Sequence, residues 1–135
     1  MNHKKCPRPI SAAHHEAAHA VIARRLGASI DRIFLDGDGG QCDFITPLGW
    51  SVRDDALVLL AGPIASMRIL KRSGFAVIGC SQDYTIARGL FDERSEFGEA
   101  MDAARELVRK HWEEIKELAR GLLESDDLMI TVAEM

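Results

Sequence analysis

The sequence predicts a single, mainly α-helical domain that carries one small β-hairpin. A length of 135 residues suits one domain and is enough to bury an apolar core. Apolar residues recur three and four positions apart in several segments, which is typical of amphipathic helices. The run D-G-D-G-G at positions 36–40 separates two short apolar stretches, and this pattern predicts the hairpin.

The composition excludes some classes of function. Hydrophobic residues make up 47% and charged residues 28% of the chain, as in ordinary globular proteins. The net charge of −4 gives no electrostatic footprint for nucleic acid. No apolar stretch approaches the roughly 18 to 20 residues that span a bilayer, and the N-terminus lacks the apolar core of a signal peptide. We therefore expect a cytoplasmic protein that binds neither nucleic acid nor membrane.

The first predicted helix covers residues 11–27 and follows a short tail, residues 1–10. Ser11 is a good N-cap, Gly27 ends the periodic run, and the segment between them is rich in alanine. The sequence H-E-A-A-H at positions 15–19 lies well inside this helix.

His15 and His19 are four residues apart, so a helix stacks them on one face and aims both imidazoles at one point. This is the geometry of a two-histidine zinc site. Glu16 points beside the metal and is placed to take a proton from a metal-bound water. The alternative is that both histidines are ordinary packed or solvated side chains. His14 has Ala18 four positions later, so we expect it to be a neighbour rather than a ligand.

Three cysteines, Cys6, Cys42 and Cys80, are an odd number without paired spacing, which argues against a disulfide framework. We expect ordinary reduced thiols. The alternative is that Cys6 or Cys80 reaches the metal.

Residues 29–35 and 41–46 are the two strands of the predicted hairpin. A hairpin with a free edge beside a metal site can bind an extended peptide by adding it as a strand. The alternative is a structural hairpin that only covers the core, and the sequence leaves both open.

Two longer helical segments follow. Ser51 and Asp54 resemble a capping box at the start of a helix that ends near residue 71, and Pro63 is expected to kink or divide it. Apolar spacing over residues 96–123 fits either one long helix or two shorter ones, with His111 packed on the apolar face.

Asp83 lies in the first turn of a short predicted helix, residues 82–90, which Ser81 caps. A carboxylate near a helix N-terminus is stabilised by the helix dipole, by about 0.3 to 1 kcal/mol, and needs no metal. On the residues alone, this structural role is the favoured interpretation of Asp83.

Four short blocks, taken in order, resemble the peptidase domain of the FtsH family of ATP-dependent zinc metallopeptidases. H-E-A-A-H-A at positions 15–20 is similar to the family's HEAGHA block, and L-L-A-G-P-I-A at 59–65 is similar to LLGGRAAEE. G-C-S-Q-D at 79–83 resembles the block with the aspartate ligand, and L-A-R-G-L-L-E at 118–124 resembles the closing segment. The resemblance covers nearly the whole chain.

The resemblance implies a zinc metallopeptidase-like helical fold over residues 11–135, with the hairpin next to the metal-binding helix. It implies that His15, His19 and Asp83 are the zinc ligands and that Glu16 is the general base. It thereby reverses the interpretation of Asp83 that the residues alone favour.

The sequence departs from the family in its middle block, where Pro63 replaces arginine and where Ser66 and Met67 replace paired glutamates. None of the four site residues is affected. The family joins this domain to an AAA-type ATPase and commonly to a membrane anchor. The chain carries no G-x-x-x-x-G-K-[ST] phosphate loop, so we expect any ATPase to be a separate partner. A homo-oligomer and a monomer both stay open.

Two functions are compatible with these features. The first is a zinc metalloendopeptidase that hydrolyses flexible or unfolded polypeptides, with Glu16 activating a zinc-bound water. The second is a non-catalytic, zinc-stabilised module that binds a peptide or a protein partner. Glu16 favours the enzyme, because a module that only holds a metal has no use for a base at that position.

Overall fold

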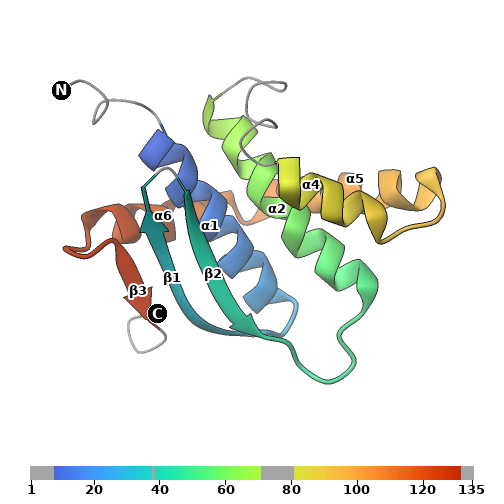
Figure 1. The fold of residues 1–135 in the computed structure, drawn as a ribbon, viewed down its shortest axis with the longest axis horizontal. Coiled ribbons are helices and arrows are strands. Elements are labelled where there is room, and N and C mark those ends of the chain that lie inside the picture. Colours follow the sequence, from blue (N-terminus) through green and yellow to red (C-terminus); the bar gives the residue numbers. More distant parts are fainter. Residues whose placement is uncertain (1–7, 38, 71–80, 132–135) are drawn as a thin grey trace.

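The computed structural model describes residues 8–37, 39–70 and 81–131. Within them it contains five helices and three short strands (Figure 1). The helices are α1 (Arg8–Arg25), α2 (Val52–Leu70), α4 (Ser81–Gly89), α5 (Arg94–Lys110) and α6 (Trp112–Glu124). The strands are β1 (Ser29–Asp36), β2 (Gly39–Ile45) and β3 (Met129–Thr131). The predicted fold class, mainly α with a small β-hairpin, is confirmed. Within the described residues no helix has the length and apolar character needed to cross a membrane.

Helix α1 is the centre of the fold. In Figure 1 the hairpin lies over it, α2 runs along its side, and α6 passes behind it; α1 contacts all of these elements. Small side chains dominate its buried surface, which lets these neighbours approach closely. The fully or almost fully buried residues of α1 are Ala13, Ala17, Ala18, Ala20, Val21, Ile22 and Ala23.

The start of α1 differs from the prediction. The helix begins at Arg8, so Ser11 is not its N-cap, and the predicted tail, residues 1–10, overlaps the first turn. Pro9 is accommodated there because the N–H that proline lacks would have no acceptor within the first turn of a helix.

Helix α2 keeps the predicted capping box. Ser51 Oγ accepts a hydrogen bond from the Asp54 backbone N–H, and Asp54 Oδ2 accepts one from the Ser51 N–H, both at 3.0 Å. The helix continues through Pro63, so of the two predicted effects of this proline, a kink or a division, the division does not occur. Proline removes one backbone hydrogen bond, whereas packing of α2 against α1, α4 and α5 supports the helix on several sides.

The segment predicted as one or two helices forms two, α5 and α6. The break lies at His111, whose φ of −106° and ψ of 22° are not helical. The His111 side chain is 15% exposed and its Nδ1 lies 3.9 Å from Glu114. Glu114 also accepts hydrogen bonds from Arg24 and Arg25, both at 2.8 Å, and so ties α6 to the end of α1.

The sheet has the strand order β2-β1-β3, with antiparallel pairing throughout. The predicted hairpin is therefore confirmed, and β3 was missed. Ile30 and Ile33 of β1 are buried in the core. In the part of the chain that the structure describes, β2 pairs only with β1, so its other edge faces away from the sheet.

Candidate metal centre

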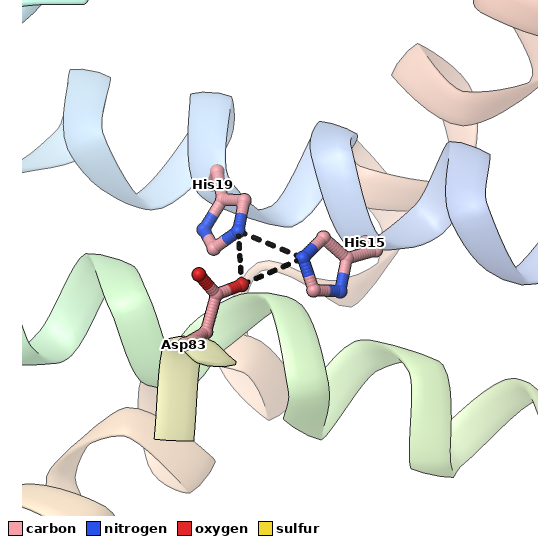
Figure 2. Close-up of side chains that lie close together, drawn as sticks. All are labelled: His15, His19 and Asp83. Carbon is pink, nitrogen blue, oxygen red and sulfur yellow. Dashed lines mark hydrogen bonds and ion pairs between the residues drawn. The ribbon is translucent and has the colours of Figure 1, made fainter. Parts of the chain in front are cut away.

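The three predicted ligands meet at one point, although they come from two helices. His15 and His19 project from one face of α1, and Asp83 lies in the first turn of α4 (Figure 2). Asp83 Oδ2 lies 2.8 Å from His15 Nε2 and 3.2 Å from His19 Nε2, and the two Nε2 atoms are 3.0 Å apart. These three residues form the group that is able to hold a metal ion among the described residues.

The separations between the donor atoms suit a small tetrahedral ion. Zinc binds nitrogen and oxygen ligands at about 2.0 to 2.2 Å, which places neighbouring ligand atoms roughly 3.3 Å or slightly more apart. The three observed separations differ from this spacing by only a fraction of an ångström. A zinc ion therefore fits with a small outward movement of the side chains.

Helix α2 contacts both imidazoles at Nδ1, the ring nitrogen that does not face the other ligands. His19 Nδ1 donates a hydrogen bond to the backbone carbonyl of Val58 at 2.7 Å, which leaves Nε2 of His19 facing the other ligands. Ser66 Oγ lies 3.4 Å from His15 Nδ1. Such partners on the second ring nitrogen fix the orientation of a metal-binding histidine.

Gly62 lies between these two contacts on α2. A Cβ atom at Gly62 would lie 2.6 Å from both Cε1 and Nε2 of His19 and 2.8 Å from Cε1 of His15. Carbon atoms do not approach that closely without displacement. The absence of a side chain at this position is therefore what allows the two rings to share the space beside α2.

Asp83 is held as a charged carboxylate. Burial of its side chain favours the neutral acid, but hydrogen bonds with His15 and His19 outweigh this effect and keep the pKa of Asp83 well below its usual range. A carboxylate that stays ionised is the form that ligates a metal. The contacts with both imidazoles go beyond the helix-dipole role that the sequence alone favoured.

Glu16 lies next to this group but outside it. The residue is only 6% exposed, and a Cβ atom at Gly40 of β2 would lie 3.0 Å from Glu16 Cγ, so the carboxyl side chain runs beneath β2. Burial raises the pKa of Glu16, against the opposing influence of His19 and His15. A carboxylate with a raised pKa is a stronger base than one exposed to water.

The other candidates are not ligands in the described structure. His14 Nδ1 donates a hydrogen bond to the Ile10 carbonyl at 2.8 Å, and the ring stacks on Trp112, so its contacts are with residues outside the group. Cys42 is a free thiol whose pKa is raised, chiefly by burial. Cys6 and Cys80 lie outside the described residues.

Sequence reasoning missed the contributions of α2. The Val58 carbonyl has no signature in the sequence, because every residue carries one. Gly62 had a weak signal, since a glycine inside a helix is unfavourable and often marks a close contact. Ser66 was noticed only as a difference from the family pattern.

The chain matches no protein-family model, and a search of the curated proteins gave no match. The function is therefore argued from the geometry of the site and from the resemblance of its short sequence blocks.

The role of Asp83 is tested by Asp83→Ala. If Asp83 is a ligand, the purified wild-type chain holds one zinc ion, and the variant loses at least about tenfold in zinc affinity, measured by competition with a chromophoric chelator. Glu96→Ala is the matched control, because Glu96 is an exposed acid in the first turn of α5. If both variants lose only about 0.3 to 1 kcal/mol of stability and keep their zinc affinity, Asp83 is a helix-terminus charge.

The close approach at Gly62 is tested by Gly62→Ala. Alanine is the better helix former by about 1 kcal/mol, yet its Cβ would displace both imidazoles, so we expect zinc affinity to fall at least about tenfold. Gly98→Ala is the control, since no atom lies within 4 Å of a Cβ at Gly98 in α5. This control should raise the melting temperature and leave zinc affinity unchanged. Equal zinc affinity in both variants would show that the site tolerates a side chain here.

Proposed function

We propose that this chain is a zinc-dependent metalloendopeptidase that hydrolyses peptide bonds of flexible or unfolded polypeptides. One observation carries the proposal: His15, His19 and Asp83 converge from two helices, while Glu16 is buried beside them without joining the group. The resemblance to the FtsH peptidase domain assigns the same roles to the same four residues.

The donor set favours zinc in a catalytic rather than a structural role. Imidazole nitrogens suit zinc and other late transition metals, and the resemblance to the FtsH peptidase domain is the reason for choosing zinc among them. Two imidazoles and one carboxylate provide three of four tetrahedral positions, which is the pattern of catalytic zinc sites. When bound, zinc supplies Lewis-acid chemistry, because it lowers the pKa of a coordinated water toward about 7 and polarises a carbonyl group.

Glu16 supplies the proton transfers in this proposal. Its carboxylate takes the proton of the attacking water and then delivers it to the nitrogen of the leaving amine. The burial of Glu16 supports this role, since burial raises the pKa of the carboxyl group and brings it nearer to working pH. His15, His19 and Asp83 hold the centre in place during both steps.

The edge of β2 suits a polypeptide substrate. Gly40 brings this strand next to Glu16, and the outer edge of β2 faces away from the sheet. An extended peptide that adds to this edge would make backbone hydrogen bonds that do not depend on its sequence. A flexible or unfolded chain meets this requirement, because its backbone is free to extend.

The proposal includes a cytoplasmic location. The three cysteines have no paired spacing, which fits a reducing compartment. The second candidate, a non-catalytic zinc-stabilised binding module, would use the same metal group and the same strand edge. The buried carboxylate of Glu16 favours the enzyme, since burying an acid that holds no metal is unfavourable for a purely structural site.

The general base is tested by Glu16→Gln. The amide keeps the shape of the side chain and removes the base, so we expect unchanged zinc content and a loss of peptide hydrolysis of about 10² to 10⁴-fold. Glu99→Gln, on the exposed face of α5, is the control and should behave as the wild type. Activity of Glu16→Gln close to wild type would overturn the mechanism. If zinc-loaded wild type is itself inactive, the binding-module function is favoured.

Substrate choice is tested with an unfolded casein-like protein and a stable folded domain, each with and without ATP. Global unfolding of a domain costs about 5 to 15 kcal/mol, and this sequence has no phosphate-binding loop with which to use ATP. We expect the chain alone to cleave the unfolded protein only, at a rate that ATP does not change. Efficient cleavage of the folded domain would contradict this expectation. Cleavage that requires an added ATPase would identify a partner acting in trans.

A further inference from the structure

We infer that Ser66 is a positioning residue of the metal centre, whose hydroxyl holds the His15 ring with Nε2 directed at the metal. The inference deepens the proposed function and rests on its zinc site. Ser66 lies on α2, is 2% exposed, and has its Oγ 3.4 Å from His15 Nδ1.

The placement of Ser66 follows a repeat of four residues along α2. Val58, Gly62 and Ser66 lie one helical turn apart, so they share one face of the helix. The Val58 carbonyl meets His19, Gly62 leaves room for both rings, and the Ser66 hydroxyl meets His15. This face of α2 therefore matches the four-residue spacing of the two histidines on α1.

The Ser66 hydroxyl is buried, so hydrogen bonding is needed to offset the cost of removing it from water. Its neighbours in sequence along α2, Ile64 and Ala65, are buried and apolar. A hydroxyl in such surroundings is unfavourable unless it is hydrogen-bonded. Nδ1 of His15 lies 3.4 Å from the Ser66 hydroxyl, on the side of α2 that faces α1.

The contact determines which nitrogen of His15 is available. A neutral imidazole carries one proton, and only the nitrogen without it can bind a metal. In the zinc-bound form Nε2 of His15, the atom that faces Asp83 and His19, would carry no proton, so the single proton of the neutral ring would lie on Nδ1 and be donated to Ser66 Oγ. His19 receives the same constraint from the Val58 carbonyl, which no side-chain substitution removes.

The test compares three variants of the full chain, Ser66→Ala, Ser66→Thr and Ser66→Val. Zinc affinity is measured by chelator competition. We expect Ser66→Ala to lose about tenfold in affinity, the lower end of the usual effect of removing an outer partner of a metal ligand. Threonine and valine have nearly the same shape, so any crowding in the core is common to both. The threonine variant should therefore bind zinc about tenfold more tightly than the valine variant.

Nitrogen-15 NMR of the zinc-loaded protein supplies a readout that a packing change alone would not alter. In the wild type, the proton of His15 should lie on Nδ1 and be protected from exchange with water. In Ser66→Ala this proton should exchange faster, whereas the Nδ1 proton of His19 should stay protected. His19 thus serves as a control within the same spectrum.

Each outcome is decisive. Equal zinc affinity in the threonine and valine variants, or wild-type affinity with unchanged His15 exchange in Ser66→Ala, overturns the role of Ser66 and leaves the proposed function intact. If Ser66→Ala does not fold, the threonine and valine variants decide the question. A folded wild-type chain that holds no zinc overturns the proposed function, and this inference with it.

Discussion

The antiparallel packing of α1 against α2 is the constraint on which the rest of the structure depends. Both imidazoles stand between these helices, and Gly62 provides the space, because a Cβ there would lie 2.6 Å from His19. Any larger separation of the helices would take the Val58 carbonyl out of reach of His19, which it now meets at 2.7 Å. The alanine-rich face of α1 and the glycine in α2 therefore serve one purpose, a short distance between two helix axes.

Polar groups buried on both sides of α1, His19 toward α2 and Glu16 toward β2, require a rigid apolar frame. His19 and Glu16 are less than a tenth exposed, and burial of such groups is unfavourable; for His19 the cost is offset by the hydrogen bond to the Val58 carbonyl. Within the described residues, every buried side-chain nitrogen or oxygen has a hydrogen-bond partner. The surrounding apolar core offsets the cost of burying these polar groups, because aliphatic side chains such as Ile22 and Leu60 are fully buried in it.

Local signals predicted much of the fold and placed three residues of the candidate site, His15, Glu16 and His19, on one helix. The hairpin turn, the Ser51 capping box and the spacing of His15 and His19 each depend on residues close together in the sequence. The features that local signals missed or left open depend on distant contacts: β3 exists through its pairing with β1, and the continuation of α2 through Pro63 is supported by the neighbouring helices. Asp83 is an intermediate case. The local sequence around it indicated a carboxylate that stabilises a helix terminus, and only the family resemblance indicated a metal ligand.

The outer edges of the small sheet belong to β2 and β3, and the edge of the longer strand, β2, bears on the proposed activity. β1 lies between these two strands, and within the described residues neither β2 nor β3 pairs with a further strand. An open edge is a liability, because it can pair with other chains and aggregate. Charged and polar side chains on β2 oppose this, as Asp43 pairs with Arg32 and Gln41 on the exposed face. Toward the turn, Gly39 and Gly40 leave the edge without side chains next to Glu16. In the proposed peptidase, this part of the β2 edge would be where an extended substrate meets Glu16.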